Sequence, residues 1–319
     1  MNKIKVAVIG AGNMGKNHVR VFSEQNDVEL VGVVDLNENI GKDIANKFNT
    51  NFYKNYKEII NGVDAVSIVV PTKFHYEVAR NFLNANVDVL IEKPITLNLK
   101  EADELIKIAG KNRSILQVGH VERFNPAIIE LNRYIKPDEI ISIDASRISF
   151  DARITDSGVV LDLMIHDIDI ILSLINDKIE DISAYGIKLK GEHEDFATAL
   201  IKFKNGVIAN LTASRITQRR ERKLKITQKD DYIKVDYMNK IIEVYKQAKS
   251  EYITEDKNVR FIYSDIVERP YIPQEEPLKA ELKSFINCIK NRKNPVVDGE
   301  AGRKALELAL KILDKINKK

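Results

Sequence analysis

Three ionisable side chains recur along one apolar stretch in the middle of the chain. Asp162, His166 and Asp169 are spaced so that, at about 100° per residue, they form one polar stripe on an apolar helix over residues 158–173. Burying carboxylates and an imidazole costs several kcal/mol unless they are paired or functional. The stripe therefore predicts either a structural network or the acid–base part of a catalytic site, since a neutral imidazole accepts protons near pH 7.

A second candidate is the lysine of Glu92-Lys93-Pro94, which comes directly after a predicted strand. A cation in this position can hold an alcohol oxygen and stabilise charge as a hydride leaves. The alternative is an ordinary surface lysine. The place of Lys93 at a strand end, before a proline that fixes the turn, favours the chemical role.

The glycine-rich run Gly10–Gly15 (GAGNMG) lies between an apolar strand over residues 3–10 and an amphipathic helix over 13–24. This pattern allows a pyrophosphate to approach the backbone at a helix N-terminus. Asp35 follows a second strand, 20 residues beyond Gly15, where a carboxylate takes the adenosine ribose hydroxyls. The first domain is thus predicted to bind a dinucleotide, and the carboxylate favours NAD over NADP.

Strands and helices alternate through this first domain, residues 1–121. Strands are predicted over residues 3–10, 28–34, 64–70, 87–91 and 115–118, and helices over 13–24, 39–48, 56–60, 74–84 and 99–111. The alternation predicts an α/β fold with a doubly wound parallel sheet, whose ligands lie at the carboxyl ends of the strands. The predicted cofactor-binding residues are Gly10, Gly12, Asn13, Met14, Gly15, Asp35, Pro71, Thr72, His75, Glu92, Lys93 and Gln117.

The second domain, residues 122–319, has a different pattern of predicted secondary structure, in which strands predominate. After a helix over 127–134 and a strand over 139–149, strands are predicted over 182–189, 197–203, 207–214, 223–227, 232–236 and 240–244, then helices over 278–289 and 301–316 at the domain junction. We expect an α+β domain with an open, mostly antiparallel mixed sheet. The 158–173 helix would cover one face, and a second copy could cover the other, giving a homo-dimer or homo-tetramer.

A basic run surrounds one predicted strand of the second domain. Its members are Arg215, Arg219, Arg220, Arg222, Lys223 and Lys225. One interpretation is a solvated sheet edge that blocks strand pairing, and the other is an anion site for a phosphorylated or nucleotide-linked substrate. No aromatic residues alternate with the basic ones, which argues against nucleic acid. Two histidines, His18 and His193, are predicted to face solvent.

Composition excludes several classes of protein. The chain has 319 residues, is 44% hydrophobic and 30% charged, and carries a net charge of only +3, which is typical of two globular domains. Cys288 is the single cysteine, so neither a disulfide nor a thiolate metal cluster is expected. Neither a signal-peptide pattern nor an apolar run of membrane-spanning length is present, so we expect a cytoplasmic protein.

These features together resemble the glucose–fructose oxidoreductase/inositol dehydrogenase/rhizopine-catabolism family over nearly the whole chain. The resemblance rests on Gly10–Gly15, Asp35, Glu92-Lys93-Pro94, the Asp162–His166 pair and the β-rich second half. It implies that Lys93, Asp162 and His166 lie at the reacting carbon of an NAD-dependent dehydrogenase. The glycine cluster that usually precedes the Asp-x-x-x-His motif is thinner in this chain, where Val159 and Val160 follow Gly158.

Two stretches, Val118–Ala127 and Val159–Ile170, resemble the branch of the family that oxidises UDP-N-acetylglucosamine at its 3-hydroxyl. This resemblance implies a 3-keto product, an aminotransferase as pathway partner, and substrate contacts from Arg123, Asn125, Arg215 and Arg219. In the expected mechanism, His166 takes the hydroxyl proton, Lys93 stabilises the alkoxide and Asp162 orients the substrate or the imidazole; Lys93 and His166 could exchange roles.

Three other interpretations of the same residues stay open at this point. A free polyol such as an inositol could be the substrate, and it would need no diphosphate site. A regulator that senses NAD without catalysis could retain the same fold. Asp162, His166 and Asp169 could instead bind a metal, since carboxylates and imidazole are common ligands, although a nicotinamide site needs no metal.

Overall fold

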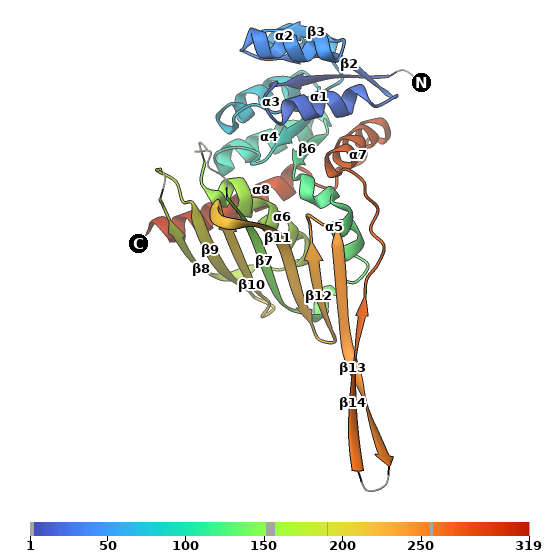
Figure 1. Ribbon diagram of the computed structural model, residues 1–319. Coiled ribbons are helices and arrows are strands. Elements are labelled where there is room, and N and C mark those ends of the chain that lie inside the picture. Colours follow the sequence, from blue (N-terminus) through green and yellow to red (C-terminus); the bar gives the residue numbers. More distant parts are fainter. Residues whose placement is uncertain (1–2, 151–156, 190, 256–257, 319) are drawn as a thin grey trace. The chain divides into compact units, whose positions relative to one another are not determined.

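The computed structural model describes residues 3–150, 157–189, 191–255 and 258–318, and the side chains of 247–265 are outside the description. The chain forms two compact units (Figure 1). The first comprises residues 1–124 and 275–308, and the second comprises residues 125–274 and 309–319. The predicted boundary at 121/122 is close to the first crossing between the units, whereas the return of residues 275–308 to the first unit differs from the predicted division.

The first unit contains a six-stranded parallel sheet in the order β3-β2-β1-β4-β5-β6. Its strands are β1 (Ile4–Ile9), β2 (Val28–Val34), β3 (Asn51–Tyr53), β4 (Ala65–Ile68), β5 (Asp88–Glu92) and β6 (Leu116–Gly119). The central strands β1, β4, β5 and β6 are almost entirely buried and read as mostly apolar runs. Only the three-residue edge strand β3 has no counterpart among the predicted strands.

In the described part of the chain, the α-helices that lie wholly in this unit are α1 (Gly15–Ser23), α2 (Glu38–Lys47), α3 (His75–Asn84), α4 (Leu99–Asn112) and α7 (Pro277–Asn291). The strand order reverses between β1 and β4, so right-handed crossovers place helices on both faces of the sheet. The reversal also opens a crevice at the carboxyl ends of β1 and β4, where doubly wound sheets bind ligands. The predicted doubly wound fold is confirmed.

Helix α7 packs against α1 in the core of the first unit. Leu282 and Phe285 share one apolar cluster with Val19 and Phe22 of α1. The prediction that this segment belongs to the second domain is therefore wrong, because sequence order alone gives no sign that a late helix returns to an early one.

The second unit contains an eight-stranded mixed sheet in the order β14-β13-β12-β11-β7-β10-β9-β8. Its strands are β7 (Ile140–Phe150), β8 (Ile179–Ile187), β9 (Phe196–Phe203), β10 (Ile208–Ser214), β11 (Ile216–Gln228), β12 (Asp231–Asp236), β13 (Ile241–Glu255) and β14 (Asn258–Glu268). The β7–β10 ladder is parallel, whereas the other ladders are antiparallel. The predicted open, mostly antiparallel mixed sheet is confirmed.

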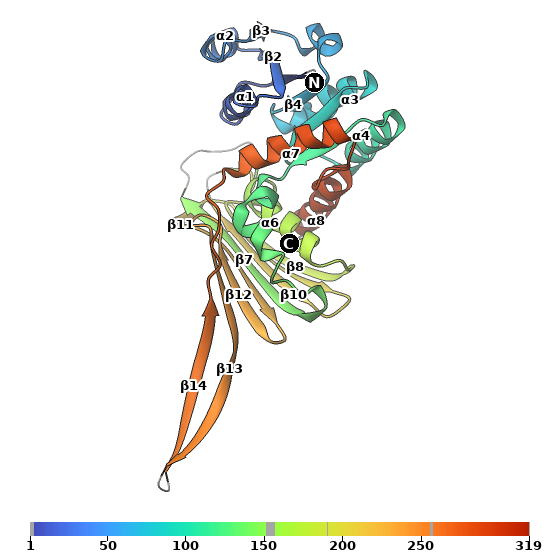
Figure 2. The same cartoon turned by 90° about the vertical axis from the view of Figure 1, so that its right-hand side faces the viewer.

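Helices α5 (Pro126–Leu131) and α6 (Ile165–Leu174) lie on the same face of this sheet (Figure 2). A π-helical turn, η6 (Val160–Met164), leads into α6. The last helix, α8 (Gly299–Asn317), begins in the first unit and ends in the second. No helix among the described residues is long and apolar enough to cross a membrane.

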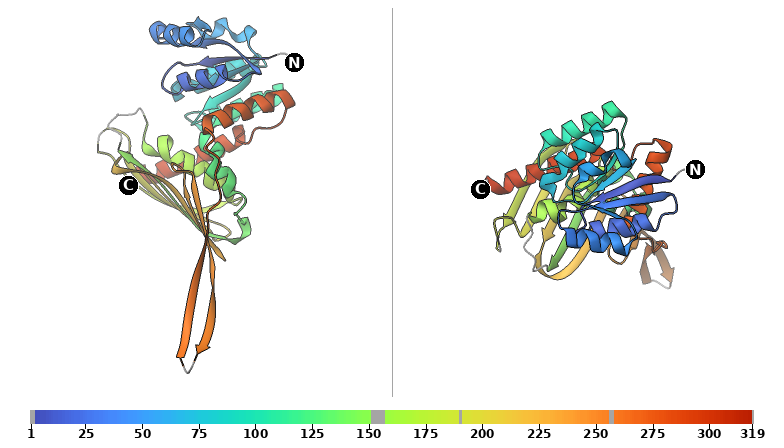
Figure 3. Two further views of the ribbon diagram at one scale, coloured as in Figure 1. Left: turned by 45° about the vertical axis from the view of Figure 1, so that its right-hand side comes forward. Right: turned by 90° about the horizontal axis from the view of Figure 1, so that it is seen from above.

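Two features of the second sheet differ from the predictions. Strands β13 and β14 form a long ribbon that continues past the pairing of β13 with β12 (Figure 3), where only a short strand over 240–244 was predicted. Residues 223–227 of β11 pair with both β12 and β7, so the interpretation of the basic run as a sheet edge was wrong for Lys223 and Lys225. Arg219 and Arg220 lie outside the ladders that β11 forms with these two strands, so their charges are placed as at a sheet edge.

Candidate active site

The glycine-rich turn after β1 has the geometry of a dinucleotide-binding loop. Gly10 has a φ of +102°, and a Cβ there would lie 2.5 Å from the carbonyl oxygen of Val69. A Cβ on Gly15 would lie 1.9 Å from the carbonyl oxygen of Gly10, so the helix starts directly against the turn. Gly12 faces open space, and no side chain caps the N-terminus of α1. The amides of this first turn are therefore suited to an anion.

Asp35 fixes the same turn from the end of β2. Its Oδ2 accepts the N–H of Ala11 at 2.7 Å, and its Oδ1 accepts the N–H of Asn37 at 2.8 Å. Each carboxylate oxygen retains a lone pair for a hydroxyl donor. The carboxylate also disfavours a 2′-phosphate at this place, as the sequence predicts.

A pocket of about 770 Å³ lies at this end of the sheet. Gly10, Gly12, Asp35 and Pro71 line it together with apolar side chains such as Leu36. A glycine turn, an open helix N-terminus and a carboxylate in one apolar pocket fit the adenosine diphosphate part of NAD. Asn13, Met14 and Thr72 belong to the turns beside it, at the start of α1 and before α3.

Lys93 follows β5 directly and is partly exposed. Its backbone N–H donates to Glu92 Oε2 at 3.3 Å. Beneath it, His18 Nε2 lies 3.2 Å from Glu92 Oε1, and His18 is fully buried. The prediction that His18 faces solvent was wrong, because the apolar side of α1 turns toward the sheet at this position.

Two other predicted cofactor residues have partners within the first unit. Both ring nitrogens of His75 lie 2.9 Å from carbonyl oxygens, those of Pro94 and Val70. Burial is the main cause that lowers the pKa of His75, although these carbonyls oppose it. Gln117 is fully buried, and its amide donates to the carbonyl of Glu281 at 3.4 Å. His75 therefore supports the loop after β4, whose Val70 lines the pocket, whereas Gln117 joins β6 to α7.

In the second unit, Asp162 lies in the π-helical turn η6 and His166 in the first turn of α6. Both are partly exposed, whereas Asp169 is 3% exposed. The expected regular stripe is interrupted, because a π turn takes more residues per turn than an α-helix. Single π turns inside helices are frequent at functional sites.

Three groups of buried charges hold η6 and α6, and sequence reasoning missed them. The first is a bidentate pair in which Arg147 of β7 donates to Asp167 at 2.9 and 3.0 Å. The Arg147 guanidinium also lies 5.5 Å from the centre of the Tyr237 ring. Asp167 is the direct neighbour of His166, so this pair fixes the backbone that carries the imidazole.

Glu194 forms the second group. Its Oε1 accepts the N–H of Val160 at 3.0 Å, and its backbone carbonyl accepts the N–H of Val159 at 3.0 Å. The carboxylate fills the space where a Cβ of Gly158 would lie, only 2.0 Å from Oε1. A glycine is therefore required at position 158 for Glu194 to hold the π turn.

Arg215 forms the third group. Its Nε donates to Asp195 at 2.6 Å and its Nη1 donates to the carbonyl oxygen of Ser157 at 2.8 Å. Arg215 is 5% exposed, so it is a buried structural cation, whereas we had predicted that it lies at a substrate anion site. A cluster of basic residues in a sequence does not show which of its arginines is buried and which are exposed.

The other predicted substrate residues have surroundings of their own. Arg219 has a side chain that is 72% exposed, 3.6 Å from Glu221, in the part of β11 where the pairing with β7 is irregular. Asn125 caps α5 by accepting the N–H of Ala127 and donates to the carbonyl of Tyr237. Arg123 is partly exposed in a 3₁₀ turn of the first unit, and His193 is exposed as expected.

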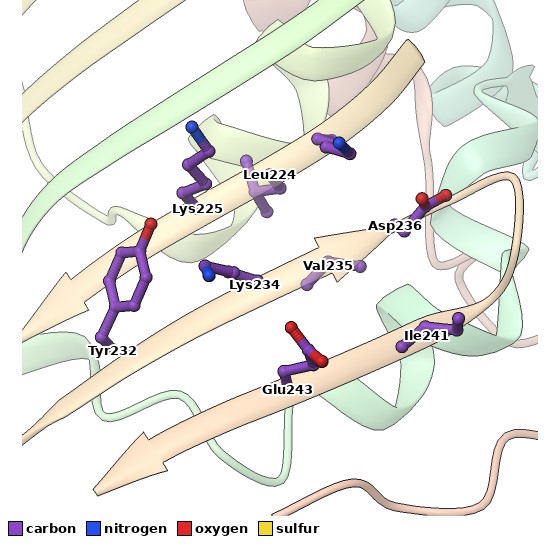
Figure 4. Close-up of a pocket in the computed structure, with 9 residues that line it drawn as sticks. Leu224, Lys225, Tyr232, Lys234, Val235, Asp236, Ile241 and Glu243 are labelled. Carbon is purple, nitrogen blue, oxygen red and sulfur yellow. The ribbon is translucent and has the colours of Figure 1, made fainter. Parts of the chain in front are cut away.

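Two lysines of the basic run line a different pocket, of about 540 Å³, on the sheet face of β11, β12 and β13 (Figure 4). Lys223 and Lys225 lie there with Lys234, whose Nζ is 4.5 Å from the centre of the Tyr245 ring. Glu243 supplies negative charge to the same wall. Across the described ranges, no three His, Cys, Asp or Glu side chains form a group that could hold a metal ion.

Comparison with known proteins identifies both halves of the chain. Residues 4–120 match the oxidoreductase family with an NAD-binding Rossmann fold, and residues 129–233 match the GFO/IDH/MocA C-terminal domain. The UDP-N-acetylglucosamine 3-dehydrogenase of Acidithiobacillus ferrooxidans is 33% identical over 98% of this chain and 97% of that protein. A solved structure of that enzyme matches with a TM-score of 0.90, at 32% identity, over 100% of this chain and 99% of the other.

More distant relatives act on other sugars and polyols. The myo-inositol 2-dehydrogenase of Thermotoga maritima is 27% identical over 96% of this chain and 94% of that protein. A levoglucosan dehydrogenase in complex with NADH and L-sorbose has a TM-score of 0.84 over 100% of this chain and 98% of the other; at 18% identity it shows the fold alone. With both domains matched and a full-length relative above 30% identity, this chain belongs to the GFO/IDH/MocA family of NAD-dependent oxidoreductases.

Proposed function

We propose that the protein oxidises the 3-hydroxyl of UDP-N-acetylglucosamine, or of a closely related UDP-sugar, to the 3-keto sugar. The observation that carries this proposal is the 33% identity to a UDP-N-acetylglucosamine 3-dehydrogenase over almost the full length of both chains. A 3-keto sugar is a substrate for transamination, so an aminotransferase is the expected next enzyme. We place the reaction in the cytoplasm, as the sequence predicts.

The proposed chemistry assigns one task to each of three side chains. His166, as the neutral imidazole, accepts the proton of the hydroxyl. Lys93 stabilises the negative charge that develops on the oxygen, and Asp162 orients the substrate or the imidazole. NAD, when bound, supplies the acceptor for the hydride that leaves the carbon bearing this hydroxyl. The partial exposure of Lys93, Asp162 and His166 is consistent with contact with a substrate.

The direct test is hydride transfer from a position-labelled substrate. UDP-N-acetylglucosamine with deuterium at carbon 3 should give deuterated NADH, detected by mass spectrometry, whereas deuterium at carbon 4 should stay in the sugar. Label from another carbon, or no NADH at all, would refute the proposed position. The same assay with myo-inositol and glucose 6-phosphate ranks the candidate substrates by kcat/KM.

A free polyol is the second candidate, because an inositol dehydrogenase also matches over the full length. UDP alone distinguishes the two: it should compete with a nucleotide-linked sugar but leave the oxidation of an inositol unchanged. Competitive inhibition by UDP against the sugar supports the nucleotide-linked substrate.

The diphosphate contact is best tested at Arg219, because it is exposed, whereas Arg215 is needed inside the fold. We expect Arg219→Ala to raise KM for the UDP-sugar about tenfold with little change in kcat, since a hydrogen bond to a charged group contributes roughly 1.5–3 kcal/mol. Arg133→Ala, at a side chain 78% exposed, is the matched control. An unchanged KM in Arg219→Ala would favour a free polyol.

The second sheet supports a proposal of self-association. Tyr185, Leu200 and Ile208 are between 44% and 59% exposed, on the face opposite the buried alanines of the same strands. We propose that this face joins copies of the chain into a homo-dimer or homo-tetramer. Light scattering should show the oligomer for the unaltered protein and a smaller species for Leu200→Glu.

A further inference from the structure

A buried polar chain lies beneath Lys93 in the first unit. Ser67 of β4, His18 of α1 and Glu92 of β5 come from three separate elements. His18 Nδ1 lies 2.8 Å from Ser67 Oγ, and His18 Nε2 lies 3.2 Å from Glu92 Oε1. His18 and Ser67 are 0% exposed, so these contacts replace every hydrogen bond to water.

The charge state of this chain follows from its donors and acceptors. Burial acts to raise the pKa of Glu92, but the hydrogen bond from His18 and the nearby charges of His18, Lys93 and His75 outweigh it, so the pKa lies below its usual value. An ionised carboxylate only accepts hydrogen bonds, so Nε2 of His18 carries the proton that faces it. The contact between Ser67 Oγ and Nδ1 holds the ring in the orientation in which Nε2 faces Glu92.

Glu92 links His18 to Lys93. One carboxylate oxygen accepts from His18, and the other accepts the backbone N–H of Lys93 at 3.3 Å. Gly119 of β6 leaves room for this carboxylate, because a Cβ there would lie 3.1 Å from it. The orientation of Glu92 therefore depends on His18 on one side and sets the backbone of Lys93 on the other.

We propose that His18 is a positioning residue for the dehydrogenation: it orients the Glu92 carboxylate, which holds Lys93 and keeps a negative charge beside it. The inference rests on the proposed action of Lys93 at the hydroxyl, whichever sugar carries that hydroxyl. The chain of hydrogen bonds ends at a fully buried serine, so its role is orientation and not proton delivery. A misplacement of about 1 Å near a reacting group can cost about a hundredfold in rate.

Two substitutions at one position separate positioning from simple packing. In His18→Gln the amide nitrogen can reach the place of Nε2 and donate to Glu92, whereas in His18→Asn it reaches only toward Ser67. We expect kcat to fall about tenfold to a hundredfold in His18→Asn and no more than about threefold in His18→Gln, with KM nearly unchanged in both. His193→Asn, at an exposed histidine, is the control.

The pH profile gives a readout that a purely structural role would not change. The charged or titratable groups that face Glu92 are His18 from α1, Lys93 next to it and His75 from α3. Without the bond from His18, burial raises the pKa of Glu92, so activity should be lost at a higher pH on the acid side. This acid limb should shift in His18→Asn and stay in place in His18→Gln.

Equal losses of kcat in the two variants, with an unshifted acid limb, would overturn the inference. If His18→Asn does not fold, Glu92→Gln tests the same link: a kcat and acid limb equal to those of the unaltered protein would also overturn it. If the unaltered protein fails to reduce NAD with every sugar and polyol tested, the proposed function is overturned, and the inference with it. If the protein oxidises only sugars that carry no UDP group, the proposed substrate is overturned. The ratio of kcat between His18→Gln and His18→Asn then still tests the inference.

Discussion

The two units position their proposed catalytic side chains in different ways. In the first, Lys93 follows a regular parallel strand and lies beside one ionised carboxylate, Glu92, which His18 and Ser67 support. In the second, Asp162 and His166 lie in and after a π turn that buried charges hold, with Arg147 and Glu194 among them.

The difference follows from the backbone. A parallel sheet satisfies its own N–H and carbonyl groups, so a residue at a strand end is positioned by the ladder and needs only local support. An irregular helical turn lacks that lattice, and here side chains supply the missing partners, as Glu194 does for the N–H of Val160. We therefore expect substitutions in the first unit to change activity with little effect on stability, and those in the second to change both.

The largest expected effect is on activity in the first unit. Lys93→Met should lower kcat about a thousandfold, since a positioned proton-transfer or charge-stabilising group contributes roughly 10²–10⁴. The melting temperature should stay unchanged, because β5, which ends directly before Lys93, stays intact. Steady-state kinetics and calorimetry check both, with the exposed Lys100→Met as the matched control. A large loss of stability in Lys93→Met would break the comparison.

The next effect is on stability in the second unit. Asp167→Asn leaves Arg147 buried without its full partner, and we expect it to lower the free energy of unfolding by about 3 kcal/mol, measured by urea denaturation. The double variant Arg147→Met, Asp167→Leu should recover most of this stability, since an apolar pair can replace a buried ion pair. If its kcat is also normal, the pair serves folding alone and does not position His166.

A smaller effect is expected at Gly158. In Gly158→Ala the new methyl would displace Glu194 from the π turn, so kcat should fall about tenfold through the altered position of Asp162. Gly191→Ala, where a Cβ meets nothing within 4 Å, is the control in the same unit. Normal kinetics in Gly158→Ala would show that the π turn tolerates the loss of its carboxylate.

The smallest expected effect is a loss of stability at acid pH in the first unit. The pKa of His75 is lowered in the folded protein, chiefly by burial. At a pH below the ordinary histidine pKa of about 6.5, the unfolded chain therefore binds a proton at this residue more readily than the folded protein does. Stability from His75 is therefore present above that pH and declines as pH falls below it. The protection factors for hydrogen exchange in α3, corrected for the intrinsic exchange rate at each pH, should fall between pH 7 and 5, and this slope should flatten in His75→Gln. An equal slope in both proteins would assign the effect to other groups.

Much of the first unit could be predicted because its signals are local. The glycine turn, Asp35 and Glu92-Lys93-Pro94 each lie within a few residues of the strand that positions them. The burial of His18 could not be predicted this way, since it depends on Ser67 and Glu92, which are 49 and 74 residues away.

The second unit was harder to predict because its signals are distant. Arg147 and Asp167 are 20 residues apart and meet only when β7 and α6 pack together. The π turn depends on Glu194, which is 34 residues beyond Val160. The resemblance of Asp162 and His166 to a family motif identified the candidate residues, but helical periodicity alone gave the wrong geometry for the turn that holds them.

The return of α7 to the first unit has a consequence for how the chain is made. During synthesis the first 124 residues leave the ribosome without Leu282 and Phe285, which complete the apolar cluster around α1. Until residue 308 has emerged, the dinucleotide-binding unit has part of its core exposed, while the whole second sheet is already available to fold. The core of the unit encoded first is therefore completed only after the whole second sheet has been made, and a chain interrupted before α7 carries the glycine turn without the helix that stabilises it.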